Sequence, residues 1–354
     1  MIKSCLQGYN ICIFAYGQTG AGKTYTMIGK SEEKDQGLIQ RMMKYLFECL
    51  NNQKCKEYHI ESQYLEIYMD EIIDLYQPIP PKGKNIRVIE DQNGVRVENL
   101  TQVEIFSCGQ AIELITKGQK NRHVENNRIN KESSRSHSIF TIQVRTIQVQ
   151  DSENSHDITK EKKSKIHFVD LAGSERLKQT LCEGQRLKEA NKINISLTQL
   201  GIVMRGLSEN QQNICYRNSK LTHILKDSLS GNSKLVMFAA VSPALECYLE
   251  TLSTIKFAER VGKIHFIVQA NEFNSTLSLE GLQNEIRRLK KQLLESNNIN
   301  KKDLKLVYNF FGIDDEKNEE ESANKFDQQL LQNQKILKWQ LLSNLYENIR
   351  IYNK

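Results

Sequence analysis

The sequence predicts an α/β fold, in which helices flank a central sheet, and three observations support this. Over residues 1–264, short apolar runs alternate with helical stretches and glycine-bearing turns. One of these runs leads directly into a glycine-rich loop that ends in lysine and threonine. The 354 residues are 39% hydrophobic and 26% charged, an ordinary globular composition that excludes a fibrous repeat or a wholly disordered chain.

The expected strands are apolar runs bounded by polar or glycine-bearing turns. Between the third run and the fourth, residues 150–165 are polar and charged, so we expect a long exposed hairpin loop there. The five runs are Tyr9–Tyr16, Tyr58–Ile67, Ile139–Val149, Ile166–Leu171 and Leu235–Val241.

Charge and cysteine content limit the partners and the compartment. A net charge of +6 is too small to make the whole surface attract anions, so a local basic patch must meet any acidic partner. The eight cysteines form no CxxC pair, which indicates reduced thiols in the cytoplasm rather than a disulfide scaffold or structural zinc. No apolar run reaches the roughly 18 residues of a membrane span. We therefore expect neither a membrane span nor a nucleic-acid partner.

The part of the chain after residue 264 has a different organisation. Residues 265–276 have no helical period and are expected to form an extended linker. A heptad pattern over 277–296 then indicates either a short coiled coil that pairs two chains or a lone amphipathic helix folded back on the domain. Residues 297–354 are expected to be a helical, partly disordered tail. The apolar positions of the heptads are Leu279, Leu282, Ile286, Leu289 and Leu293.

A phosphate-binding loop is predicted at GQTGAGKT, residues 17–24, which fits G-x-x-x-x-G-K-[ST]. Its glycines let the backbone curl so that successive N–H groups point at phosphate oxygens, and the next helix directs its positive end at the same anion. Lys23 would reach the β- and γ-phosphates, and the Thr24 hydroxyl would ligate Mg²⁺. Because strand, loop, lysine and threonine fall in order, a nucleotide site explains the pattern better than a chance glycine loop.

Two further segments carry candidate chemistry. DLAG, residues 170–173, ends a buried strand, where Asp170 can hold Mg²⁺ through water and Gly173 can present its N–H to the γ-phosphate. NKESSRSH, residues 130–137, precedes another strand, so Ser134 can touch Mg²⁺ and Ser133 can place the attacking water. Taken alone, the serine cluster is better explained as a polar turn with helix-capping hydroxyls.

Together, GQTGAGKTYTM, NKESSRSHSIF and DLAGSER resemble the motifs of a kinesin motor domain, in the same order. The resemblance continues through YRNSKLTHILKDSLSGNSK and ETLSTIKFAERV, and it covers about residues 8–264. It implies a P-loop NTPase fold with a central mixed sheet flanked by helices, followed by a helical extension. It also implies a microtubule-stimulated ATPase that uses ATP and Mg²⁺, binds microtubules and works on the cytoskeleton.

The resemblance assigns roles by position. Arg135 and Glu175 are expected to form the ion pair that closes over the nucleotide, with water as nucleophile and Ser133 on the path of its proton. Thr24, Ser134 and Asp170 are the expected Mg²⁺ ligands, the last through water. The expected catalytic residues are Ser133, Ser134, Arg135, Asp170, Gly173 and Glu175. The expected nucleotide-binding residues are Gly17, Gln18, Thr19, Gly20, Ala21, Gly22, Lys23, Thr24 and, beside the adenine, Tyr25.

A basic segment, residues 176–226, is the candidate surface for acidic tubulin. A solvated helix face would also explain such a charge run, but family position favours binding for Lys178, Arg217 and Lys220. The linker would dock and undock along the domain, and a motor placed before the heptads resembles motors that walk towards the plus end.

The sequence departs from the family at its start, because the strands that precede the P-loop strand in kinesins are absent from residues 1–8. We expect an incomplete motor domain with an open strand edge, weaker base binding and lower stability. Three functions follow as alternatives: an ATP-driven motor, a microtubule-binding fragment that does not move, or a small GTPase. The absence of an NKxD guanine-reading motif disfavours the GTPase.

Overall fold

The computed structural model describes residues 1–276 apart from 31, 53–56, 78–84, 93, 129–134, 151–157 and 176–184. These residues belong to one compact unit, Met1–Thr276. The predicted coiled coil at 277–296 and the tail at 297–354 lie outside the described residues, as do Ser133, Ser134 and Lys178.

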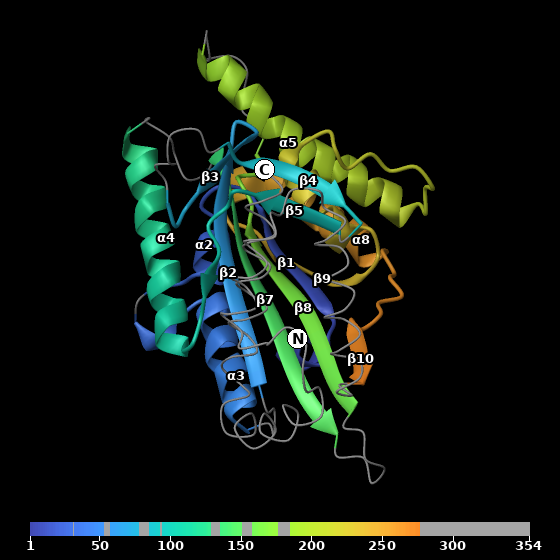
Figure 1. The fold of residues 1–354 in the computed structure, drawn as a ribbon. Coiled ribbons are helices and arrows are strands. Elements are labelled where there is room, and N and C mark those ends of the chain that lie inside the picture. The colour runs from blue at the N-terminus through green and yellow to red at the C-terminus, as the bar shows by residue number, and fades with distance from the viewer. Residues whose placement is uncertain are drawn as a thin grey trace, which may run out of the picture. The chain divides into compact units, whose positions relative to one another are not determined.

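A mixed sheet runs through this unit, with its strands in the order β3-β2-β7-β8-β1-β9 (Figure 1). β1 is parallel to β8 and β9, whereas β7 is antiparallel to β2 and β8. Short strands β6 and β10 pair with β2 and β8, and β4 and β5 form a separate hairpin. The bounds are β1 Asn10–Gly17, β2 Glu57–Tyr68, β3 Glu71–Asp74, β4 Arg87–Asp91, β5 Gly94–Glu98, β6 Val103–Glu104, β7 His137–Gln150, β8 Ile158–Asp170, β9 Ser233–Ala240 and β10 Glu272–Thr276.

Helices cover both faces of the sheet. Buried residues of α1 (Ile2–Leu6), α2 (Lys23–Met27), α3 (Leu38–Asn52) and α4 (Cys108–Arg128) join the apolar cluster on one face. The cluster on the other face contains residues of α5 (Gln185–Ser208), α6 (Lys220–Ile224), α7 (Lys226–Leu229) and α8 (Tyr248–Gly262). Two 3₁₀ turns, η1 (Glu33–Asp35) and η4 (Leu245–Cys247), complete the described elements.

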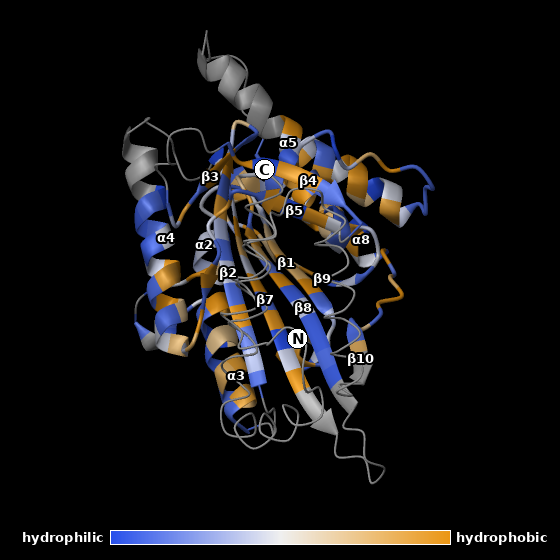
Figure 2. Ribbon diagram, viewed as in Figure 1, coloured by the Kyte–Doolittle hydropathy of each residue, from blue (hydrophilic) through white to orange (hydrophobic). Residues whose placement is uncertain are grey.

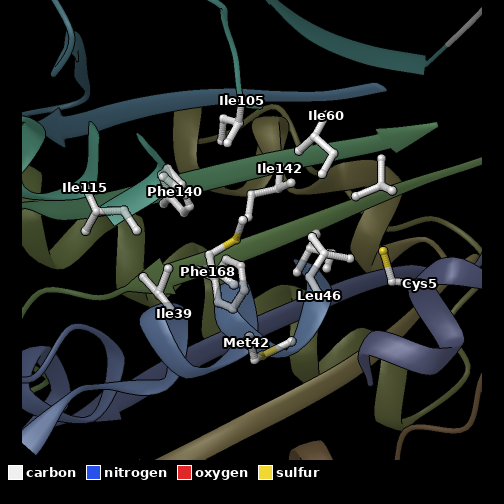
Figure 3. Close-up of a cluster of buried hydrophobic side chains, with 14 of the residues drawn as sticks. Cys5, Ile39, Met42, Leu46, Ile60, Ile105, Ile115, Phe140, Ile142 and Phe168 are labelled. Atoms are coloured by element: carbon white, nitrogen blue, oxygen red, sulfur yellow. The ribbon is translucent and has the colours of Figure 1, made fainter. Parts of the chain in front are cut away.

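The central strand β1 is apolar on both faces because each face meets a layer of helices. Ile11 and Ile13 belong to the cluster on the α3 side, whereas Cys12 and Phe14 belong to the cluster on the α5 side. Figure 3 shows the first cluster, where Phe140 and Phe168 of the sheet pack with Met42 and Leu46 of α3. This packing fixes the end of β1, where the glycine-rich loop begins.

The five predicted strands are confirmed, but the predicted loop at 150–165 was wrong for its second half. β8 begins at Ile158, so residues 158–165 are paired strand rather than exposed loop. This part of β8 is hydrophilic (Figure 2) because charged side chains form cross-strand ion pairs, Arg145–Glu161 with β7 and Lys160–Glu272 with β10. Its polar composition concealed the strand.

The linker and the sheet edge follow in part what the sequence predicted. Residues 265–271 form neither helix nor strand, and residues 272–276 form the strand β10, which is antiparallel to β8. Among the described strands, β9 pairs with β1 alone. None of the helices in the described part of the chain is long and apolar enough to cross a membrane.

Candidate functional site

The glycine-rich loop connects the end of β1 to the start of α2. Gly22, with φ of 97°, adopts the left-handed conformation that favours glycine directly before Lys23. Gly17 is required for a different reason, since a Cβ there would lie 2.0 Å from the carbonyl oxygen of Ala240 in β9. The loop therefore begins in close contact with β9 and ends at the turn that starts α2.

Lys23 is buried at the base of this loop. Its Nζ donates a hydrogen bond to the carbonyl oxygen of Gln18, at 2.8 Å. Burial lowers the pKa of Lys23, and the charges of Asp170 and Glu175 oppose that shift. The buried ammonium places a positive charge inside the loop, which is suited to a phosphate chain.

Asp170 lies at the end of β8 and faces the first turn of α2. The Thr24 hydroxyl donates to Asp170 Oδ2 at 2.7 Å, and the buried Arg122 donates to the same oxygen from Nη1 at 3.1 Å. The other oxygen, Asp170 Oδ1, is buried without a hydrogen-bond partner among the described residues. Such an orphaned acceptor beside a threonine hydroxyl suits a water molecule bound to Mg²⁺.

Arg122 and Glu66 are functional-site neighbours that sequence reasoning missed. Arg122 reaches from α4 to Glu66 Oε1 of β2 at 3.2 Å, and its Nη2 donates to the backbone oxygen of Ser136 at 3.2 Å. Both charged side chains are buried. The one available signal was Glu66 itself, a carboxylate inside the apolar run YLEIY, which calls for a buried cation.

His137 joins the start of β7 to the segment after β8. Its Nδ1 accepts a hydrogen bond from the Ala172 backbone N–H at 3.0 Å, so the proton is on Nε2, which donates to Ser196 Oγ at 2.7 Å. Burial, with smaller effects of the charges on Arg122 and Lys23, lowers the pKa of His137 to about 3. This neutral histidine connects the two predicted switch segments to α5.

The segment after β8 folds against the glycine-rich loop. Glu175 accepts hydrogen bonds from the Thr19 backbone N–H at 2.8 Å and from Thr19 Oγ1 at 2.5 Å. A Cβ at Gly173 would lie 2.3 Å from Thr19 Oγ1 and 2.4 Å from the Glu175 carboxylate oxygens, so a larger residue there would require these two side chains to move. Arg135 is partly buried, and its predicted ion pair with Glu175 stays a prediction.

Two side chains border the loop on its outer side. Tyr25 is 53% exposed on α2, and its hydroxyl donates to Asp35 Oδ1 at 3.3 Å. Gln18 Nε2 donates to the Cys247 thiol of η4 at 2.9 Å. An exposed aromatic ring beside the loop agrees with the predicted adenine contact of Tyr25, which stays a prediction.

Two of the predicted partner-binding cations, Arg217 and Lys220, lie in the described part of the chain, and both form ion pairs within it. Arg217 forms an ion pair with Glu90 of β4, with Nη2 and Oε2 at 2.8 Å. Lys220 forms one with Glu71 of β3, with Nζ and Oε2 at 2.9 Å. The sequence indicated the cations but not these carboxylates, which come from distant strands.

The linker is held by the turn between α1 and β1. Gly8 O accepts hydrogen bonds from Asn271 N at 2.9 Å and from Asn271 Nδ2 at 3.1 Å. Asn271 O accepts in turn from Lys163 N of β8 at 3.0 Å. Asn271 therefore fixes the point at which β10 joins the sheet.

The fold and the site define a P-loop NTPase in which the segments beside β7 and β8 meet at the phosphate loop. A family model described as kinesin motor domain matches residues 1–264. The chain belongs to the kinesin motor family.

Known proteins agree with this assignment. The chain is 41% identical over 310 residues to the kinesin-like protein KIN-12C of Arabidopsis thaliana, covering 83% of this chain and 15% of that protein. It is 40% identical over 309 residues to the kinesin-like protein KIF15 of Homo sapiens, covering 83% of this chain and 22% of that protein. The chain thus spans less than a quarter of these relatives. The solved structure of a fast kinesin superposes with a TM-score of 0.69 at 39% identity, covering 77% of this chain and 75% of that one.

Proposed function

We propose that the chain is an ATP-hydrolysing microtubule motor. The observation that supports this best is the convergence of Lys23, Thr24, Asp170 and Glu175 on one loop. Each comes from a segment that the family resemblance names, and the hydrogen bonds join them into a single site. The relatives are named as kinesins, and the solved structure of the fast kinesin is described as bearing on ATPase mechanism and on interactions with microtubules.

Nucleotide binding follows from the chemistry of the loop. Backbone N–H groups and the buried Lys23 would surround the β- and γ-phosphates, replacing the hydrogen bond that Lys23 makes to Gln18. Thr24, Ser134 and, through water, Asp170 would hold Mg²⁺, which supplies charge neutralisation at the phosphate oxygens. The orphaned Asp170 Oδ1 supports this assignment.

Hydrolysis needs positioning more than covalent chemistry. We propose that Ser133, Gly173 and the pair Arg135–Glu175 orient the attacking water and the γ-phosphate. Glu175 is already tied to Thr19 of the phosphate loop, so a change at the γ-phosphate would be transmitted to the segment after β8. His137 extends that connection to α5 through Ser196.

Motion would be passed on to the linker. β8 carries Asp170 at one end, and its other end pairs with β10. Docking of the linker on β8 supports a plus-end-directed stroke, with microtubules as the track and Lys178, Arg217 and Lys220 on the contact surface. We place the protein on cytoplasmic microtubules, as a homodimer if 277–296 pairs two chains.

One observation favours a second candidate, a microtubule-binding protein that does not cycle. Among the described strands, β9 pairs only with the P-loop strand β1, so loss of order in β9 would disturb the site. ATP turnover of the full chain with and without microtubules separates the two. Stimulated turnover is expected for a motor, whereas co-pelleting without stimulation would support the second candidate and contradict the first.

A further inference from the structure

A single carboxylate lies among three basic side chains on the surface proposed to meet the microtubule. Arg217 donates to Glu90 Oε2 from Nε at 3.2 Å and from Nη2 at 2.8 Å. Lys226 Nζ donates to Glu90 Oε1, and His223 Nε2 lies 3.6 Å from Oε2. Glu90 is partly buried, whereas the Arg217 side chain is 67% exposed. The carboxylate is therefore less exposed than Arg217, which solvent and partners can reach.

The Arg217–Glu90 contact has the geometry of an exchangeable pair. Both guanidinium hydrogen bonds end on one oxygen, Oε2, rather than on the two oxygens of a bidentate pair. Lys226 occupies the other oxygen. An exposed ion pair of this kind contributes little to stability, because water and salt compete with it. A partner carboxylate can therefore take its place.

The β4–β5 hairpin stays attached without the charge of Glu90. Asp227 Oδ2 of α7 accepts a hydrogen bond from Val95 N of β5 at 2.7 Å. Val88 and Val97 also pack against the apolar cluster beneath the hairpin. A change at Glu90 alone should therefore alter the surface charge and leave the hairpin in place.

We propose that Glu90 is an internal counter-ion that competes with an acidic partner for Arg217 and so weakens binding of the chain to microtubules. This inference rests on the proposed function, since it takes the acidic partner to be tubulin. Removing the charge would free Arg217 and Lys226 together, and a partner carboxylate would no longer have to displace one from the same chain. Hydrogen bonds from Lys226 and Arg217 lower the pKa of Glu90 to about 2, so the competing charge is present at neutral pH.

The test compares two substitutions that remove one negative charge from the same strand. Glu90→Gln keeps the size and the acceptor oxygen, while Asp91→Asn alters a carboxylate that pairs with Arg96, with Oδ2 and Nε at 3.0 Å. The full 354-residue chain is co-pelleted with microtubules polymerised from purified tubulin, at low and at physiological ionic strength. We expect Glu90→Gln to tighten binding by about three- to ten-fold at low salt and less at higher salt, and Asp91→Asn to change it by less than about two-fold.

A double substitution shows whether the effect passes through Arg217. With Arg217→Ala, adding Glu90→Gln should give a smaller gain than in the wild type, because only Lys226 then remains to be freed. Glu90→Asp keeps the charge but moves it away from Arg217 by one methylene. This variant should therefore also bind microtubules more tightly than the wild type. That variant decides the question if Glu90→Gln melts below the assay temperature.

The outcomes separate this inference from the function beneath it. If the wild-type chain does not pellet with microtubules at any ionic strength, the proposed function fails and the inference fails with it. If the wild type pellets and folded Glu90 variants bind equally or more weakly, the inference alone is overturned. An equal gain from Asp91→Asn would also overturn it, because general charge would then explain the effect.

Discussion

At the scale of single residues, Lys23 shows how a functional group can oppose stability. Its ammonium is buried, and that burial lowers the pKa of the side chain. Within the described part of the chain, the acceptor that its ammonium reaches is the neutral carbonyl oxygen of Gln18. The protein therefore keeps a desolvated charge where a nucleotide would compensate it.

This arrangement predicts opposite effects of Lys23→Ala on binding and on folding. Nucleotide affinity should fall by about 2–4 kcal/mol, roughly 30- to 1000-fold in Kd, because a charge-assisted phosphate contact is lost. The free energy of unfolding without nucleotide should stay the same or rise. Titration with a fluorescent ATP analogue and urea unfolding measure the two. A large loss of stability with retained nucleotide binding would contradict the assignment.

Two buried histidines predict how stability depends on pH. Burial lowers the pKa of both His137 and His167 to about 3, while unfolded histidine titrates near 6.5. As pH falls below about 6.5, the unfolded state binds protons that the native state excludes. The contribution of the two histidines to stability is therefore fully present above that pH and is lost as the pH falls towards 3. From pH 7.5 to pH 5.5, each histidine should lower the free energy of unfolding by about 1.4 kcal/mol.

Urea unfolding at the two pH values measures this loss. His137→Gln keeps a donor and an acceptor near Ser196 and Ala172 but does not titrate in this range. It should therefore remove the contribution of His137 and leave that of His167. If the variant and the wild type lose the same free energy between the two pH values, His137 is not held neutral.

At the scale of elements, attachment of the linker depends on a glycine outside it. Gly8 has φ of 92°, and a Cβ there would lie 2.9 Å from the backbone oxygen of Asn271. Gly8→Ala should therefore weaken the bonds that start β10 by about 1–2 kcal/mol. Amide exchange in β10 should become about five- to thirty-fold faster, as hydrogen-exchange mass spectrometry of residues 265–276 would show.

The chain supplies a matched control for this change. Gly262, at the end of α8, has no atom within 4 Å of where its Cβ would lie and no positive φ. Gly262→Ala should leave exchange in β10 unchanged. Equal acceleration by both substitutions would mean that the linker responds to general loosening rather than to the contact with Gly8.

What the sequence could predict of these elements depended on whether the signal was local. The strand, loop and helix around residues 17–24 are contiguous, so their pattern was sufficient to place Lys23 and Thr24 at the start of α2, directly after the loop. Arg122 and Glu66 are 56 residues apart, and nothing in the polar helix marks which of its cations is buried. The start of β8 was concealed because its side chains are charged on both faces.

At the scale of the whole molecule, large apolar side chains are exposed on the elements that follow β9 in the chain. Within the described residues, β9 pairs only with β1, and its own side chains are mostly half-buried. The elements that follow it expose Leu245 at 88% and Leu249 at 73%, and the linker exposes Ile267 at 92%. An unpaired strand edge beside exposed apolar side chains is a template for association between chains.

We therefore predict association that depends on concentration and on this region. Leu245→Lys with Leu249→Lys should reduce the fraction of large species in sedimentation velocity, because charge beside a strand edge opposes edge-to-edge pairing. Phe106→Lys is the control, since Phe106 is 67% exposed near the start of α4, among elements on the opposite face of the sheet. A similar reduction by Phe106→Lys would show that added charge acts generally, and no reduction by the double variant would show that chains associate elsewhere.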